Sequence, residues 1–342
     1  MNRLKPIRDE NAWTPADFPT RRSWVKPLTP EMVREIEAAA ERVTKSGQPF
    51  WSITAADVPL PAARPLLEAA FQDLEYGPGF AVLAGLPSRR YSRDENVVLL
   101  AVVGCHLGRV VDQTWRGLKI EDIVDKGLPM DRKTRGYMGT HAIGFHTDGS
   151  DFAVLYCLEK AEEGGESVIV SATSVYNTIL EERPDLLDVL LRGFHHHRRG
   201  EQAPGEPPVT PGRIPVFEVK GGLLHCCYNR NPLAWLAPEG YGYEAIEVEA
   251  LDYLDATLAR RSLQLHMDFQ PGDMQFINNY NVLHGRTEYR DAPGKKRHLL
   301  RLWLENGRCR RQGDNIIDLY APWHGKPRDA AARRATATGG TA

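Results

Sequence analysis

Apolar positions recur with a helical period in some stretches of the chain and alternate with polar positions in others. The stretches with a helical period are residues 29–40, 65–71, 93–107, 176–191 and 245–265. Thr29 and Pro30 are typical of a helix start, because threonine caps the first turn and proline has no amide hydrogen to leave unpaired there. Pro184 is expected to break the fourth of these helices.

Short runs of apolar and alternating residues between glycine turns predict strands. These strands are expected at residues 77–87, 152–158, 167–171, 194–198, 216–219, 223–228, 274–278 and 298–304. Many short strands with glycine turns favour a closed or sandwiched antiparallel sheet. We therefore predict a mainly β, α+β fold, in the form of a jelly roll with helices outside.

The strand-rich region is expected to belong to a single domain that spans residues 1–324. Residues 1–75 form an N-terminal arm and helices in this prediction, and residues 325–342 have so little apolar content that we expect a disordered tail. Residues 112–142 are charged, contain several glycines and show no long periodic segment. Because long irregular connections in compact domains are often functional, this segment is a candidate lid loop.

Composition narrows the class of protein. The 342 residues carry a formal charge of −2, with 42% hydrophobic and 26% charged residues, which is ordinary for a globular protein. No concentrated basic face predicts a nucleic-acid or membrane partner, and neither a signal peptide nor a membrane span is expected. Five cysteines without paired spacing favour reduced thiols in the cytoplasm. A homo-oligomer is a mild expectation at this size.

The most specific chemical signal is a close His-x-Asp pair with a distant histidine. His146 and Asp148 alternate by two, so on a strand they share one face, and His284 has to arrive from another strand. Two imidazoles and one carboxylate hold Fe(II) on one face and leave positions open for a cosubstrate and O2. Arg297, a little beyond His284, supplies a cationic fork for the far carboxylate of 2-oxoglutarate. The pattern indicates a non-haem iron, 2-oxoglutarate-dependent oxygenase.

Several segments between about residues 75 and 305 resemble the TauD/TfdA family of Fe(II)/2-oxoglutarate dioxygenases. The matching segments are 79–87, the helix leading to Leu107-Gly108, Phe145-His146-Thr147-Asp148-Gly149, Gly164-Gly165-Glu166-Ser167 and the block 271–304. The resemblance implies a double-stranded β-helix with flanking helices. It also implies His146, Asp148 and His284 as the iron ligands and catalytic centre.

The same resemblance assigns residues to the cosubstrate. It places Arg297 and Ser167 on 2-oxoglutarate, and Arg301 on either the cosubstrate or an anionic group of the substrate, although an ion pair with a nearby acid is an alternative for Arg301. Arg286 and Arg290 lie too close to His284 to match the family spacing and are left out.

The substrate region departs from the better-understood members. Gln113, Trp115 and Arg116 stand where the taurine-type pattern has other residues, and Ala142 replaces the usual asparagine, so taurine itself is a doubtful substrate. Gln113, Trp115 and Arg116 are candidate substrate contacts, together with Arg301. Because Asp148 is present, halogenation is disfavoured.

Two histidine-containing segments need a separate interpretation. The segment His195-His196-His197 could bind metal, but we interpret it as a polar strand beside a water-filled cavity. One of its side chains could contact the substrate. Cys226 and Cys227, next to His225, would point to opposite faces of a strand and are not expected to chelate one ion.

The sequence therefore predicts an enzyme that uses Fe(II), 2-oxoglutarate and O2 to hydroxylate an unactivated C–H bond of a small polar or anionic metabolite, with release of succinate and CO2. Desaturation, epimerisation or ring formation would use the same oxidant. Two alternatives are a catalytically silent double-stranded β-helix that only binds, and a jelly-roll metalloprotein that does not use 2-oxoglutarate.

Overall fold

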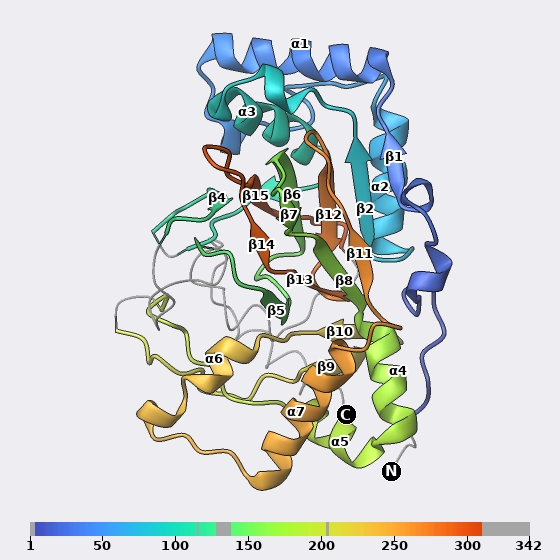
Figure 1. Cartoon of the computed structure of the whole chain (residues 1–342), viewed down its shortest axis with the longest axis vertical. Coiled ribbons are helices and arrows are strands. Elements are labelled where there is room, and N and C mark those ends of the chain that lie inside the picture. The colour runs from blue at the N-terminus through green and yellow to red at the C-terminus, as the bar shows by residue number, and fades with distance from the viewer. Residues whose placement is uncertain (1–3, 115, 128–137, 203–204, 310–342) are drawn as a thin grey trace, which may run out of the picture.

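The computed structural model describes residues 4–114, 116–127, 138–202 and 205–309 (Figure 1). Its helices are α1 (Pro30–Ser46), α2 (Arg64–Glu75), α3 (Arg93–Gly104), α4 (Ala172–Glu182), α5 (Pro184–Arg192), α6 (Arg230–Ala234) and α7 (Ala245–Leu258). Short 3-10 turns occur at Pro15–Asp17, Arg21–Ser23, Phe50–Ser52, Ser88–Arg90 and Ala237–Glu239. None of the described helices is long and apolar enough to cross a membrane.

Most strands belong to two sheets. The larger sheet has the order β1-β2-β12-β6-β15-β3, with β4 also paired to β15, and the smaller has the order β11-β8-β13-β5. The strands of the larger sheet are β1 (Val25–Pro27), β2 (Phe80–Ala84), β3 (Arg109–Val110), β4 (Ile120–Val124), β6 (Phe152–Glu159), β12 (Met274–Asn278) and β15 (His298–Glu305). Those of the smaller sheet are β5 (Ile143–His146), β8 (Ser167–Ser171), β11 (Leu265–Met267) and β13 (Val282–Arg286). Separate pairs are formed by β7 (Glu163–Gly164) with β14 (Tyr289–Arg290) and by β9 (Phe217–Lys220) with β10 (Leu223–Cys226).

The two sheets face each other, and helices cover their outer faces (Figure 1). Ile169 of β8 and Val282 of β13 share one apolar cluster with Ile277 and Leu299 of the larger sheet, which places this cluster between the sheets. A second cluster joins α1, α2 and α3 to the outer face of the larger sheet, and a third joins α4, α5 and α7 to the smaller one. The chain is thus mainly sheet with flanking helices, as predicted.

Side-chain alternation along the strands decides which residues reach the space between the sheets. On β15, Leu300, Leu302 and Leu304 pack outward against the helices, while Leu299 packs inward. Arg301 and Trp303 share the inward face with Leu299, because strand side chains alternate. Polar residues on this face therefore lie inside the molecule.

Several local predictions are confirmed. Thr29 caps α1 by accepting a hydrogen bond from the Met32 amide, and Pro30 is the first residue of that helix. Pro184 begins α5 directly after α4 ends, so the predicted break is present. All five cysteines are free thiols.

Two predictions of secondary structure are wrong. The last helix ends at Leu258 rather than near Leu265, and Leu265–Met267 form strand β11, which pairs with β8. Residues 194–198 make only isolated bridges rather than a strand. Arg199 directly after them has a left-handed backbone, with φ 56°, which interrupts extended structure.

The predicted irregular connection at 112–142 is also wrong in part. Residues 120–124 form strand β4, which pairs with β15, and β5 begins directly after the segment. Residues 128–137 lie outside the described part of the chain, as do Trp115 and the whole predicted tail at 325–342. The lid function of the segment stays a prediction.

Candidate metal and cosubstrate site

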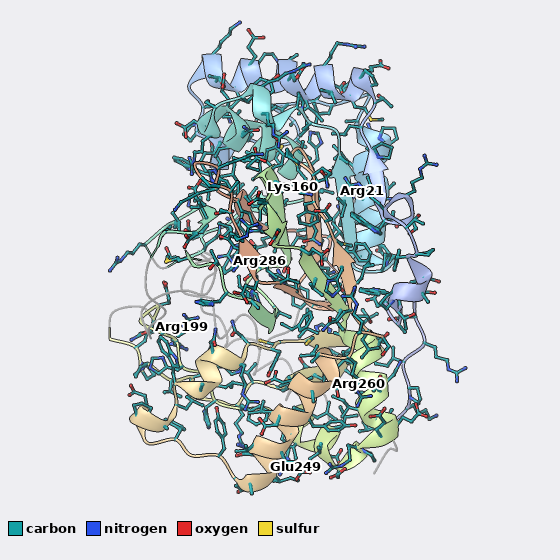
Figure 2. The ribbon with its side chains drawn as sticks, viewed as in Figure 1. Arg21, Lys160, Arg199, Glu249, Arg260 and Arg286 are labelled. Carbon is teal, nitrogen blue, oxygen red and sulfur yellow. The ribbon has the colours of Figure 1, made fainter. Side chains whose placement is uncertain are left out.

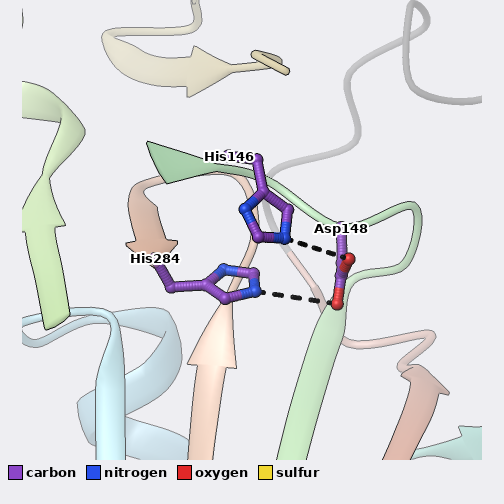
Figure 3. A group of neighbouring side chains, drawn as sticks. All are labelled: His146, Asp148 and His284. Carbon is purple, nitrogen blue, oxygen red and sulfur yellow. Dashed lines mark ion pairs between the residues drawn. The ribbon is translucent and has the colours of Figure 1, made fainter. Parts of the chain in front are cut away.

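Three side chains converge at the open end of the smaller sheet. β5 ends at His146, Asp148 follows two residues later, and β13 places His284 directly opposite His146 in the strand register. His146 Nε2 and His284 Nε2 each lie 3.8 Å from a different oxygen of Asp148. One ligand atom from each residue can be chosen so that all three lie within 4.8 Å of one another (Figure 3). This arrangement has the size and donor set of a facial site for a divalent metal ion.

A glycine allows the two histidine strands to approach. A Cβ atom on Gly285 would lie 2.6 Å from the carbonyl oxygen of Ile143 on β5, which is closer than real contacts allow. Glycine between His284 and Arg286 therefore permits β5 to pair with β13 and brings the two imidazoles to a centroid distance of 4.3 Å.

The protonation states suit a metal cation. Burial alone raises the pKa of Asp148, but interactions led by the charge of Arg301 outweigh burial and lower that pKa to about 2. Burial and the neighbouring His146 lower the pKa of His284 to about 3, so its imidazole is neutral. His146 Nδ1 donates to the Gly144 carbonyl at 2.9 Å, which leaves Nε2 as the nitrogen on the side of Asp148. Metal binding requires an ionised carboxylate and imidazole nitrogens that carry no proton toward the ion.

Three donors hold the Asp148 segment in place. Trp303 Nε1 donates to Asp148 Oδ2 at 2.9 Å, and Arg301 Nη1 lies 3.3 Å from both carboxylate oxygens. The Asp148 amide donates to Asn279 Oδ1 at 3.0 Å. The carboxylate therefore has a fixed orientation before any metal binds.

The residues expected to bind 2-oxoglutarate are Ser167 on β8 and Arg297, which directly precedes β15. Arg297 is only 4% exposed, and in the described part of the chain its Nη1 has no hydrogen-bond partner. It packs directly over Gly165, where an added Cβ would meet Arg297 Nε at 2.9 Å. Ser167 is buried and donates to Gln275 Oε1 at 3.0 Å. A buried guanidinium with an unmet N–H fits a carboxylate ligand, because an unpaired buried charge is costly.

A cavity of about 1400 Å³ connects these groups. The residues on its wall include the expected ligands and candidate contacts, namely Gln113, Arg116, His146, Asp148, Ser167, His284, Arg297 and Arg301.

The side chain of Gln113 is fully buried, and both ends of its amide are hydrogen-bonded. Nε2 donates to the carbonyls of Arg301 and Lys119, and Oε1 accepts from Arg301 Nε. Gln113 therefore positions Arg301.

The other histidine segments lie outside the triad. His197 reaches the cavity wall, whereas His196 is buried away from it. Within the described residues, the three-residue group around Asp148 is the one cluster of His, Cys, Asp or Glu close enough to hold an ion. Arg290, which was left out on spacing, is exposed and pairs with Glu162 and Glu163.

Two residues at this site were not singled out from the sequence. Trp303 follows Arg301 by two positions, so strand alternation starting from Arg301 would have found it. Arg286 was set aside on spacing, yet it is only 6% exposed and lies on the cavity wall. Arg286 follows His284 by two positions, and alternation on a strand would have placed both side chains on the same face.

The family described as "Taurine catabolism dioxygenase TauD, TfdA family" matches residues 41–303. The chain belongs to this family. It is 36% identical to the FR-33289 synthase of Streptomyces rubellomurinus over 89% of this chain and 92% of that protein. It is 31% identical to the taurine hydroxylase-like protein SAT17 of Stachybotrys chartarum, over 86% and 79% of the two chains.

A solved structure shares the fold. The asparagine oxygenase in complex with Fe(II), 2S,3S-3-hydroxyasparagine and succinate superposes with a TM-score of 0.63 at 16% identity, covering 82% of this chain and 94% of that one. Family membership confirms the predicted enzyme class, an oxygenase that uses Fe(II), 2-oxoglutarate and O2. It also argues against a silent binding module.

Proposed function

We propose that this TauD/TfdA-family enzyme is a hydroxylase in which His146, Asp148 and His284 hold Fe(II). The convergence of His146 at the end of β5, Asp148 just after it and His284 on β13 carries the proposal, because two imidazoles and an ionised carboxylate lie close enough to share one ion. Trp303 and Arg301 then act on the metal indirectly, by fixing the carboxylate of Asp148.

For the cosubstrate, we assign Arg297 and Ser167 to the far carboxylate of 2-oxoglutarate. Both are buried on the cavity wall, and Arg297 retains an unmet N–H among the described residues. When bound, iron and 2-oxoglutarate supply the oxidising power for hydroxylation of an unactivated C–H bond, with release of succinate and CO2. The chain positions that bond and excludes water from the space between the sheets.

The substrate is proposed to be a small polar or anionic metabolite. Arg301 lines the cavity beside the metal site, and Gln113 fixes the direction of its guanidinium. Arg116 adds a second cation to the same wall. One relative is named taurine hydroxylase-like, and taurine carries a sulfonate, which is consistent with an anionic group in the substrate. Trp115 remains a candidate contact outside the described residues.

The broader architecture is part of the proposal. Two facing, largely antiparallel sheets with a metal site at one open end support a double-stranded β-helix. We further propose that residues 1–324 act as one oxygenase domain. Five free thiols favour a reducing, cytoplasmic environment.

The test is an anaerobic titration of the purified protein with Fe(II) and then 2-oxoglutarate, followed by visible absorption. Bidentate chelation produces a weak metal-to-ligand charge-transfer band. The band is expected in the wild-type protein and is expected to be lost in His146→Ala. His197→Ala is the matched control, because its side chain lines the same cavity with 14% exposure, against 16% for His146, outside the proposed ligand set.

The outcomes test the ligand assignment separately from the choice of cosubstrate. A band in the wild type and His197→Ala, but not in His146→Ala, supports the ligand assignment, and substrates can then be screened by succinate release. A band that persists in His146→Ala contradicts the assignment. If iron binds and no band forms in any variant, 2-oxoglutarate is not the cosubstrate.

A further inference from the structure

Arg286 lies near Ser167 and Arg297, the residues assigned to 2-oxoglutarate, although its spacing from His284 does not match that of the cosubstrate arginine in the family. The register of β13 with β8 pairs Arg286 with Ser167, so their side chains are neighbours on one face of the sheet. Arg286 also follows His284 by two residues on the same strand. Two residues of strand span about 7 Å, which is comparable with the length of an extended five-carbon dicarboxylate.

Arg286 and Arg297 both lie close to the ring of Tyr289. Their guanidinium carbons lie 4.6 Å and 5.4 Å from the ring centroid. Figure 2 shows Arg286 near the middle of the molecule, well away from the helices at either end. Both cations line the cavity, so a ligand that enters the cavity can reach both of them.

These two cations are buried with unmet donors. Arg286 is 6% exposed and Arg297 is 4% exposed. Nε and Nη1 of Arg286 and Nη1 of Arg297 have no hydrogen-bond partner in the described part of the chain. The face of Tyr289 offsets only part of the cost of burying two like charges side by side. A carboxylate between them would satisfy the donors and neutralise the repulsion.

The remaining nitrogen of Arg286 contacts a different segment. Nη2 donates to the carbonyl of Gly139 at 2.8 Å and to the carbonyl of His141. These residues lie immediately before β5, the strand that ends at His146. The guanidinium of Arg286 therefore connects the surroundings of Ser167 with residues 139–141, which lead to the metal site.

We propose that Arg286 is a second cation for the far carboxylate of 2-oxoglutarate, beside Arg297, and that it links cosubstrate binding to the order of residues 139–141. This inference rests on the proposed function. A carboxylate on Nε and Nη1 holds the guanidinium in the orientation in which Nη2 reaches the two carbonyls. The segment before His146 is then most ordered when the cosubstrate is bound.

A purely structural role makes a different prediction. If Arg286 only clamps residues 139–141, its loss disturbs the site for every 2-oxo acid equally. If it binds the far carboxylate, its loss matters only for an acid that has one. 2-Oxovalerate provides the comparison, because it has the same five-carbon chain and 2-oxo acid group as 2-oxoglutarate and ends in a methyl group.

The experiment measures dissociation constants of both acids on the anaerobic Fe(II) protein by calorimetry. In Arg286→Gln, we expect 2-oxoglutarate to bind about 10- to 100-fold more weakly, as for loss of a charge-assisted hydrogen bond. Binding of 2-oxovalerate should change less than about threefold on the same reasoning, since it lacks the second carboxylate. Arg286→Lys should recover part of the affinity for 2-oxoglutarate. The control is Arg290→Gln, an exposed arginine of β14 paired with glutamates, which should leave both constants unchanged.

Hydrogen exchange of the wild-type protein tests the link without a variant. Addition of 2-oxoglutarate should protect the amides of residues 139–146, and 2-oxovalerate should protect them less. Equal weakening of both acids in Arg286→Gln, an unchanged constant for 2-oxoglutarate, or equal protection by the two acids overturns the inference while the proposed function stands. A wild-type Fe(II) protein that binds neither acid overturns both.

Discussion

Replacement of Trp303 by phenylalanine tests whether a neighbour of the metal site controls the metal. The substitution keeps an aromatic ring at a position only 4% exposed and removes the indole N–H that donates to Asp148 Oδ2 at 2.9 Å. Asp148 keeps Arg301 Nη1 at 3.3 Å, so the charge of its carboxylate remains compensated. The carboxylate loses the shortest of the hydrogen bonds that fix its orientation.

The magnitude follows from the kind of bond that is lost. A hydrogen bond to a charged group contributes about 1.5–3 kcal/mol, which corresponds to roughly 10- to 150-fold in a binding constant. Loss of a residue that orients a metal ligand typically lowers metal affinity by about 10- to 100-fold. The two estimates agree, so we expect Trp303→Phe to weaken Fe(II) binding by about 10- to 100-fold.

The assay is anaerobic calorimetry with Fe(II), with urea unfolding of the metal-free protein as the measure of stability. Trp13→Phe is the matched control, because Trp13 is also 4% exposed and its Nε1 donates to the Pro78 carbonyl at 2.7 Å, outside the metal site. Both variants should lose about 1–3 kcal/mol of stability, since each loses the hydrogen bond of one indole N–H. Only Trp303→Phe should lose metal affinity. Equal Fe(II) affinity in the two variants would refute the reasoning.

Three further outcomes are expected. Gly285→Ala places a Cβ 2.6 Å from the Ile143 carbonyl and should separate β5 from β13, abolishing measurable Fe(II) binding in the same calorimetry; wild-type affinity would contradict this. Arg297→Ala should raise the KM for 2-oxoglutarate about 10- to 100-fold while Fe(II) binding persists, and an unchanged KM would remove Arg297 from the cosubstrate site. Burial lowers the pKa of His196 from 6.5 to about 4, so between these pH values the unfolded chain binds a proton that the folded protein does not. Stability should therefore fall by on the order of 3 kcal/mol as the pH drops through this window. His196→Leu should make the fall in urea unfolding smaller by this amount while the contribution of His284 remains, whereas His141→Leu, at an exposed position, should leave the fall unchanged.

Local features of the sequence were sufficient for much of the fold and for the chemical class. The Thr29–Pro30 start of α1 and the break at Pro184 depend only on neighbouring residues, so they could be predicted without tertiary information. The spacing of His146 and Asp148 depends only on strand alternation. With His284 and Arg297, this spacing indicated the oxygenase class that family membership confirms.

Tertiary structure decided what depends on register between distant segments. Residues 120–124 form strand β4 because they pair with β15, and Leu265, the last residue of the predicted helix, belongs instead to strand β11, which pairs with β8. No local period encodes these pairings, because a strand partner is selected by the whole sheet.

The same reason separates the site residues that could be predicted from those that could not. Gln113 holds Arg301 although 188 positions separate them, and Arg286 faces Ser167 only through the pairing of β13 with β8. The sequence by itself determined which side chains could bind iron and a carboxylate. The packing of the two sheets decided which of them share one buried space, because burial and pairing are properties of the assembled layers.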